Sequence, residues 1–303
     1  MIANFADFCL WTYVVVDDIW QQIGPLFRHP GPTSVCSDSE ILTLALVGEC
    51  RGWDMETELL AHWREHPDLF PHLPSQSRFN RRRRRLRAAF NLLRRSLLGL
   101  LDLAADRQTV IDSLPVPVIQ FHLVPHSPAA STWKSYGAAF GKVPTKKQTI
   151  FGYKLHLLVT LSGLILDFEL APANASDLAV GEELLTTHHD LDTLGDKGYI
   201  SQPLAIALHE ECGVLLHTLP KANQARQVPA EVSRVHNALR QIVETVNSQL
   251  ADQFRLEVNH AHTFAGLCTR LLTKLAAHSL CVYLNRVFGN ANFLQIKSLA
   301  FPK

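Results

Sequence analysis

The sequence lacks the closely spaced cysteine pairs that mark zinc sites and redox motifs. Its six cysteines are spread over the 303 residues, and no two of them have the C-x-x-C spacing. Several lie within apolar stretches, as buried free thiols do. A disulfide framework is also not expected in a chain of this size. The cysteines therefore argue against a zinc site and favour the reducing cytosol.

The sequence also lacks an apolar run of the length needed to cross a membrane. No run reaches the roughly 18 apolar residues of a membrane helix. The apolar segment from Phe8 to Val16 has no basic residue before it, and Asp17 and Asp18 close it, so it makes a poor signal peptide. We therefore expect a cytoplasmic protein with no membrane partner.

An excess of charge of one sign is almost absent, because 29 basic residues face 28 acidic ones and the formal net charge is +1. The distribution is nevertheless uneven. Nine arginines and no acid lie between Arg78 and Arg95, and five lysines and no acid lie between Ser113 and Leu166. Local fields attract a polyanion even where the net charge is near zero. These two segments are therefore candidate surfaces for a nucleic acid.

Hydrophobic residues make up 47% of the chain, which is enough for a buried core. Residues 1–107 have helical periodicity throughout. The predicted elements are a helix that begins at a capping box from Ser37 to Glu40, a helix over residues 56–64, a proline-rich connection over 67–74, and a long helix from Ser75 or Ser77 to Leu103. We expect this part of the chain to be an all-helical region.

From Thr109 onwards the pattern changes to alternating strands and helices. We predict a short strand over residues 109–112, a polar loop over 122–149, a hairpin of 151–161 and 164–170, a helix from about 178, a strand over 192–196, a helix over 202–211, a strand over 213–219, a basic linker over 220–229, and helices over 231–254 and 264–288. This order predicts an α/β domain over residues 108–303, with a mixed sheet flanked by helices. It matches the element order of the ribonuclease H-like fold.

Three acidic residues are expected where elements of this domain end or meet. Asp112 is predicted to end the first strand, Asp196 to end the fourth, and Glu244 to lie inside the helix after the fifth. A buried carboxylate is unfavourable unless it is paired or binds a metal ion. Taken singly, each acid also has an ordinary explanation as a helix cap, a turn former or a solvent-facing residue. The three together would suit a pair of Mg²⁺ ions about 4 Å apart.

Five short motifs, spread from residue 111 to residue 244, support this grouping. They are Ile111-Asp112-Ser113-Leu114-Pro115-Val116-Pro117, Phe151-Gly152-Tyr153-Lys154-Leu155-His156, Pro172-Ala173-Asn174-Ala175-Ser176-Asp177, Gly195-Asp196-Lys197-Gly198-Tyr199, and Arg240 four residues before Glu244. In type and order they resemble the motifs of DDE transposases from bacterial insertion sequences. The 84 positions between the two aspartates and the 48 from the second aspartate to Glu244 leave room for the predicted elements.

The resemblance implies a function that the acids alone do not. Asp112, Asp196 and Glu244 would hold two Mg²⁺ ions, or Mn²⁺ in their place, for cleavage and strand transfer of DNA. The partners would be the terminal inverted repeats of the element and a target DNA. A homodimer is expected because two element ends are handled together. Residues 1–107 would bind DNA, with a helix-turn-helix as one hypothesis.

Two other functions stay open at this point. Some relatives have a tyrosine and a lysine flanking the last motif, where this chain has Asn237 and Ala251. One alternative is thus a catalytically inactive DNA-binding protein derived from a transposase. The other is a nuclease of the same fold that makes no strand-transfer product.

A run of five arginines is the first candidate for DNA contact. It consists of Arg81, Arg82, Arg83, Arg84 and Arg85. On a helix such a run covers every face, and binding of backbone phosphates would explain it. The alternative is a basic stretch that only increases solubility. The lysine-rich segment from Lys134 to Lys147 is a second candidate surface.

Four further residues are expected close to the acids and the DNA. Lys154 and His156 point the same way on one strand because side chains alternate, so they are predicted to line a DNA channel. Lys197 and Arg240 are predicted to contact phosphates. The simpler alternatives are an exposed edge position for Lys154 and a surface ion pair of Arg240 with the acid one helical turn later.

Overall fold

The computed structural model describes residues 2–28, 31, 34–101, 106–143, 147–220 and 228–300. The chain forms two compact units. The first, which we call the helical unit, consists of Met1–Leu101 and Gln249–Lys303. The second, which we call the sheet unit, consists of Asp102–Ser248. No helix in the described ranges is long and apolar enough to span a membrane.

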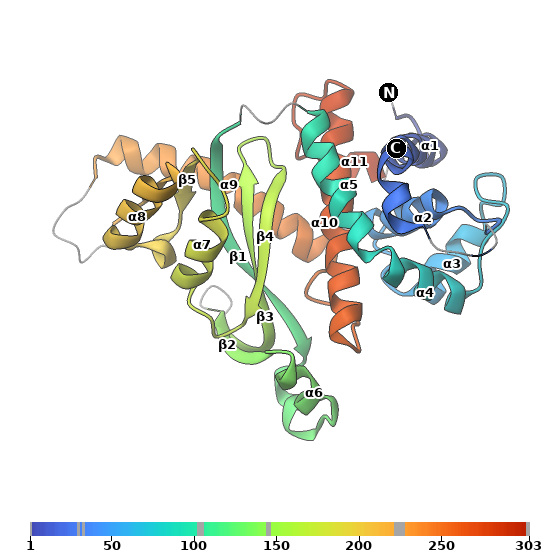
Figure 1. Ribbon diagram of the computed structural model, residues 1–303, viewed down its shortest axis with the longest axis horizontal. Helices are drawn as coiled ribbons and strands as arrows, with labels where there is room; N and C mark the ends of the chain where they lie inside the picture. Colours follow the sequence, from blue (N-terminus) through green and yellow to red (C-terminus); the bar gives the residue numbers. More distant parts are fainter. Residues whose placement is uncertain are drawn as a thin grey trace. The chain divides into compact units, whose positions relative to one another are not determined.

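The helical unit is organised around one long helix from the C-terminal part of the chain (Figure 1). Its helices are α1 (Phe5–Ile23), η1 (Gly24–Phe27), α2 (Asp38–Cys50), α3 (Glu56–Arg64), α4 (Gln76–Arg85), α5 (Arg87–Leu100), α10 (Phe264–Val287) and α11 (Lys297–Ala300). Helix α10 packs against α2, α4 and α5. Sixteen of its 24 residues are buried, and a helix that is buried on nearly all sides needs neighbours around it.

This packing differs from the single division predicted at residues 107 and 108. Residues 249–303 pack with the N-terminal helices, because these helices cover the apolar surface of α10. The functional division of the chain into a DNA-binding region and a catalytic domain stays a prediction.

The predicted helix starts agree well with the structure, and one predicted helix is divided. The capping box is present, because the Ser37 hydroxyl accepts from the Glu40 N–H at 3.1 Å and the Ser37 N–H donates to the Glu40 carboxylate at 2.5 Å. The long helix predicted from Ser75 or Ser77 is two helices that meet at Leu86, whose backbone leaves the α-helical region. Like charges four residues apart destabilise a helix, and the arginine run lies directly before this break.

The sheet unit contains a six-stranded mixed sheet. Its strands are β1 (Gln108–Ile119), β2 (Ala139–Val143), β3 (Gln148–Thr160), β4 (Ile165–Pro172), β5 (Asp192–Gly195) and β6 (Leu215–Thr218). Strand β1 lies between β3, to which it is antiparallel, and β5, to which it is parallel, and β6 continues the parallel part. Strands β2 and β4 both pair with β3. The unit also contains the helices α7 (Asp177–Leu185), α8 (Gln202–Cys212) and α9 (Ala230–Asp252), the last of them up to residue 248.

The sequence predictions for this unit are confirmed in order and corrected in two places. The hairpin turns at Gly163, whose φ of 83° favours glycine. Strand β1, however, does not end at Asp112 but continues to Ile119. The region predicted as a loop over 122–149 contains η3 (Phe121–His126), α6 (Ala129–Ser135) and β2, because residues 139–143 complete the edge of β3. Most of the predicted basic linker, 221–227, lies outside the described residues.

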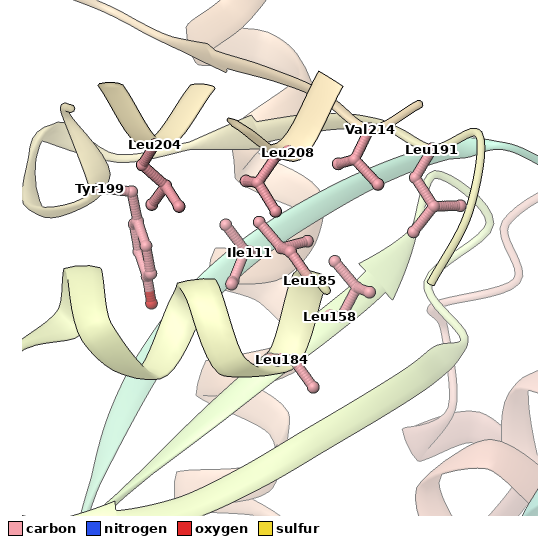
Figure 2. Packing of buried hydrophobic residues seen from close by; sticks show 9 residues of the cluster. All are labelled: Ile111, Leu158, Leu184, Leu185, Leu191, Tyr199, Leu204, Leu208 and Val214. Carbon is pink, nitrogen blue, oxygen red and sulfur yellow. The ribbon is translucent and has the colours of Figure 1, made fainter. Parts of the chain in front are cut away.

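The core of the sheet unit lies on one face of the sheet, against α7 and α8 (Figure 2). It contains Ile111, Leu158, Leu184, Leu185, Leu191, Tyr199, Leu204, Leu208 and Val214. Because successive side chains of a strand point to opposite faces, Ile111 faces this core and Asp112 faces the other side. There the side chain of Asn247 on α9 donates a hydrogen bond to Asp112. The fold thus points the first acid towards α9.

Candidate active site

Asp112 is partly buried and is held by a side chain of α9. Asn247 Nδ2 lies 2.9 Å from its Oδ2. The pKa of Asp112 is raised to about 6, chiefly by burial and to a smaller extent by the charges of Asp196 and Glu244, while the Ser113 N–H and Arg240 act in the opposite direction. Asp196 and Glu244 therefore both lie close enough to Asp112 to oppose its ionisation.

Asp196 is positioned by the end of β5 and by a tight turn. The parallel pairing of β1 and β5 ends at Ile111 and Gly195, so the two aspartates are the next residues of neighbouring strands. Asp196 caps the 3-10 helix η5 (Lys197–Tyr199) and accepts a hydrogen bond from the Gly198 N–H at 2.6 Å. This bond fixes the direction of the carboxylate.

Gly198 brings a further acid to the site. A Cβ at this position would lie 2.9 Å from Asp196 Oδ1 and 3.2 Å from Asp177 Oδ2. A side chain there would displace the ends of both carboxylate side chains, so glycine leaves their arrangement undisturbed. Asp177, the last residue of the motif that begins at Pro172, therefore lies beside Asp196.

Glu244 and Arg240 face one another on α9. Arg240 Nη2 lies 3.6 Å from Glu244 Oε1, as the spacing of four residues predicted. The side chain of Glu244 is 55% exposed, so the pair adds little stability by itself. Arg240 Nε is buried and has no hydrogen-bond partner among the described residues. The Arg240 Nε–H can thus still donate a hydrogen bond to a ligand beside the acids.

A second layer of polar side chains lies behind Asp196. His156 is fully buried, and its Nδ1 lies 3.0 Å from the hydroxyl of Tyr199. Burial lowers the pKa of His156 to about 4, against the raising effect of Asp177. Lys154 donates to the Ala175 carbonyl at 2.8 Å and to the Asp177 carboxylate. As placed, these side chains support Asp177, and His156 is closed to a phosphate.

Tyr199 joins the hydrophobic core to this polar layer. Its ring packs in the core and its hydroxyl reaches His156. Its pKa is raised well above the ordinary value by burial and then by Asp112, Asp177 and Asp196. Lys197, the first residue of η5, is exposed and free to reach a ligand.

The predicted three-acid metal cluster is not assembled as a ligand shell. Among the described residues, no group of three His, Cys, Asp or Glu side chains is arranged to hold a metal ion. The donor chemistry of Asp112 and Asp196 still fits Mg²⁺, which takes oxygen ligands and typically one or two carboxylates. The raised pKa of Asp112 reflects burial and repulsion that a divalent cation would relieve. The side chain of Glu244, by contrast, is more than half exposed.

The arginine run is divided by the fold of the helical unit. Arg82 binds Asp38 at 2.5 Å, and Arg83 is buried against Glu49 at 2.5 Å. Arg85 lies 3.6 Å from Asp38. Arg81 and Arg84 are exposed on the face of α4 that lines an open depression. The run therefore consists of internal ion pairs and of two arginines that are available to a ligand.

Asn247 and Asp177 are the site residues that the sequence interpretation missed. Asn247 lies three positions after Glu244, on the same face of α9, and this spacing is a usable signal. Asp177 ends the P-x-N-x-x-D motif, whose aspartate was interpreted only as the start of a helix. In both cases the sequence gives the residue type, but it does not show which acid the side chain lies beside in the fold.

The sheet order and the acids at neighbouring strands define a ribonuclease H-like domain with a carboxylate site. The family model described as the transposase DDE domain matches residues 104–280, which is more than half of the chain. The chain therefore belongs to the DDE transposase family, as the sequence motifs indicated. The comparisons with curated proteins and with solved structures gave no match.

Proposed function

We propose that the chain is the transposase of a bacterial insertion sequence, which acts in the cytoplasm as a homodimer. It would bind the terminal inverted repeats and catalyse Mg²⁺-dependent strand cleavage and strand transfer, with Asp112, Asp196 and Glu244 as ligands of two metal ions. The observation that supports this best is the position of Asp112 and Asp196 directly after the last paired residues of β1 and β5, with Glu244 near enough to act on Asp112, inside a DDE domain.

Each polar group of the site has a definable task in this reaction. A bound divalent ion supplies activation of the attacking water or 3′-hydroxyl and stabilisation of the leaving oxygen. Asn247 holds one oxygen of Asp112, and the Gly198 N–H holds one oxygen of Asp196, so both carboxylates are oriented before a ligand arrives. Arg240, with its unpartnered Nε, would bind the phosphate that reacts.

The DNA contacts form the second part of the proposal. Lys197 is exposed next to Asp196 and would bind a phosphate that flanks the cut. Lys154 and His156 would act through Asp177, which they hold beside Asp196, unless DNA binding opens this layer. Contacts by Arg81, Arg82, Arg83, Arg84 and Arg85 would be unequal, because three of the five already have acidic partners.

The test is cleavage of a plasmid that carries the inverted repeats of the element. We expect Asp112→Asn, Asp196→Asn and Glu244→Gln each to lower the rate on the order of a thousand-fold, because a lost metal ligand removes several kcal/mol of transition-state stabilisation. Glu231→Gln is the matched control, since this acid lies exposed in the first turn of α9. Equal rates in all of these proteins would refute the proposed catalytic residues.

Two outcomes separate the alternatives. Cleavage with no joined product on a strand-transfer gel would identify a nuclease of the same fold. DNA binding by the wild-type chain, with no cleavage at any Mg²⁺ or Mn²⁺ concentration, would identify an inactive DNA-binding derivative.

A further inference from the structure

The helical unit contains a pocket that no feature of the catalytic site explains. It lies between α4, the segment before α10 and the first turns of α10, and its volume is about 90 Å³. A single water needs only roughly 10 to 15 Å³ measured in this way. The pocket is therefore large enough for a tetrahedral oxyanion. Its polar lining includes Asn80, Arg83, Arg84, His260, His262 and Arg270.

The lining is rich in hydrogen-bond donors and has a single acid. That acid is Glu56, and Arg270 already holds it at 3.0 and 3.1 Å. Arg83 is 3% exposed and binds Glu49, yet its Nε has no hydrogen-bond partner among the described residues. A buried guanidinium nitrogen without a partner is a costly arrangement that an anion would satisfy.

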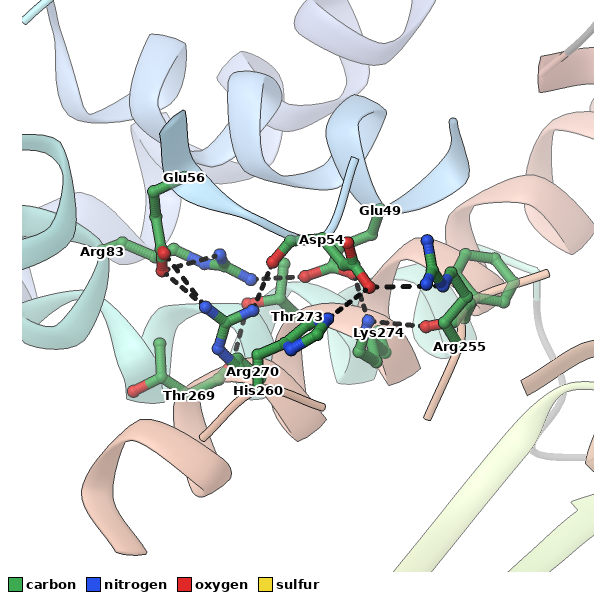
Figure 3. A network of polar contacts seen from close by, with 11 residues as sticks. Glu49, Asp54, Glu56, Arg83, Arg255, His260, Thr269, Arg270, Thr273 and Lys274 are labelled. Carbon is green, nitrogen blue, oxygen red and sulfur yellow. Dashed lines mark hydrogen bonds and ion pairs between the residues drawn. The ribbon is translucent and has the colours of Figure 1, made fainter. Parts of the chain in front are cut away.

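The surrounding ion-pair network leaves the pocket with excess positive charge (Figure 3). The carboxylates of this network are Glu49, Asp54 and Glu56, and the permanent cations of the network are Arg83, Arg255, Arg270 and Lys274. Three negative charges thus face four positive ones, before Arg84 and the histidines are added. This imbalance indicates an anionic ligand.

The start of α10 adds a further attraction for an anion. The Thr263 hydroxyl caps this helix by accepting from the Gly266 N–H at 3.1 Å, and both residues line the pocket. The N-terminus of a helix carries partial positive charge and free N–H groups. A ligand in the pocket would therefore meet the arginines on one side and the start of a 24-residue helix on the other.

An open depression continues the pocket along α4. It is lined by Gln76, Ser77, Asn80, Arg81 and Arg84, and it shares Asn80 and Arg84 with the pocket. These positions follow one face of the helix, and none of them is acidic. Arg84 has no hydrogen-bond or ion-pair partner among the residues that the structure describes. A polymer of phosphates fits such a track better than a single small anion does.

We propose that this pocket binds one backbone phosphate of DNA, while the adjoining face of α4 binds the next phosphates. Arg84 and Asn80 would contact the phosphate at the mouth of the pocket, and His262 would contact it from the segment before α10. The inference rests on the proposed function, because that function makes DNA the ligand. It also adds residues 260–263 to a surface for which the sequence indicated only the arginine run.

The test measures binding of the full chain to a labelled duplex oligonucleotide by fluorescence anisotropy, with EDTA present so that no strand is cut. We expect Arg84→Gln to weaken binding about tenfold at low salt. Between about 50 and 200 mM salt, the slope of log affinity against log salt should fall by about one, as for one lost phosphate contact. His262→Gln should weaken binding in the same direction.

The matched control is Arg95→Gln, which removes an exposed arginine of α5 that does not line the pocket. If Arg84→Gln and His262→Gln bind DNA as Arg95→Gln does, the pocket proposal is overturned while the proposed function stands.

A wild-type chain that does not bind the duplex would instead overturn the proposed function. The pocket is then judged with inorganic phosphate at constant ionic strength. A melting temperature that phosphate raises in the wild type, but not in Arg84→Gln, supports an anion pocket. No rise in the wild type overturns it.

Discussion

Both units of the protein shield carboxylates from water, Glu49 fully and Asp112 in part, but they surround them differently. In the helical unit, Glu49 lies 2.5 Å from both Lys274 and Arg83. Its burial opposes ionisation, yet these two cations outweigh burial, and the pKa of Glu49 is lowered. In the sheet unit, Asp112 has other acids as neighbours and one cation, Arg240, and its pKa is raised to about 6.

The comparison shows how to distinguish a structural acid from a functional one. A buried ion pair that is complete on both sides stabilises the fold only in the sense that breaking it is costly. A partly compensated group of carboxylates raises the free energy of the folded state and offers a site to a cation from outside. Perturbed carboxylates of this kind cluster at functional sites. The charges that surround a carboxylate, and not its burial, therefore distinguish a structural acid from a functional one.

The largest effect on stability is expected from breaking the ion pairs of Glu49 with Lys274 and Arg83. Glu49→Gln leaves Lys274 buried with one partner fewer, and we expect the free energy of unfolding to fall by about 3 to 5 kcal/mol. Urea denaturation measures this change. The control is Glu58→Gln on α3, an exposed acid whose loss should change stability by less than about 0.5 kcal/mol. A loss below about 1 kcal/mol for Glu49→Gln would mean that water reaches the network.

This network also shows where sequence analysis fails. Glu49 and Lys274 are 225 positions apart, and no local pattern joins them. In the arginine run, five identical residues stand side by side, so nothing in the sequence separates Arg83, which is buried, from Arg84, which is exposed. Their difference arises only when α4 packs in the helical unit. Long-range ion pairs therefore become evident only in the three-dimensional structure.

Local signals predicted the other elements well, and β1 shows their limit. The local signals are the capping residues, the Ser162-Gly163 turn and the motifs around the acids. They mark structure that depends on residues close together in the sequence. Pro115 and Pro117 lie in the part of β1 beyond its predicted end, although proline has no N–H for a sheet ladder. They are tolerated because β5 pairs with β1 only up to Ile111, so the rest of β1 pairs on one side with β3 alone.

A smaller effect is expected where the orientation of the uncompensated acid is disturbed. Asn247→Ala removes the donor that holds Asp112, and we expect cleavage to slow about 10- to 100-fold, with a higher Mg²⁺ concentration needed for half-maximal rate. Stability should change little. Gln241→Ala on the exposed face of α9 is the control. An unchanged Mg²⁺ requirement would show that Asn247 does not position Asp112.

The smallest effect concerns the pH dependence of stability. Asp112 ionises near its ordinary value of 3.8 in the unfolded chain and at about 6 in the folded chain. Between these values the folded chain holds the proton more tightly, so the contribution of Asp112 to stability is present below about pH 4 and is lost as the pH rises to about 6. Glu49, whose pKa is lowered, has the opposite sign and loses its contribution as the pH falls.

Asp112→Asn removes the titrating group and should therefore gain stability relative to the wild type over this range. We expect a gain of about 1 to 2 kcal/mol between pH 4 and pH 6.5, measured by urea denaturation in EDTA. Asp68→Asn, an exposed control in the helical unit, should show no such trend. A constant difference between Asp112→Asn and the wild type would mean that the acids are compensated in solution. Added Mg²⁺ should narrow the gain, because the cation supplies the positive charge that Lys274 and Arg83 supply to Glu49.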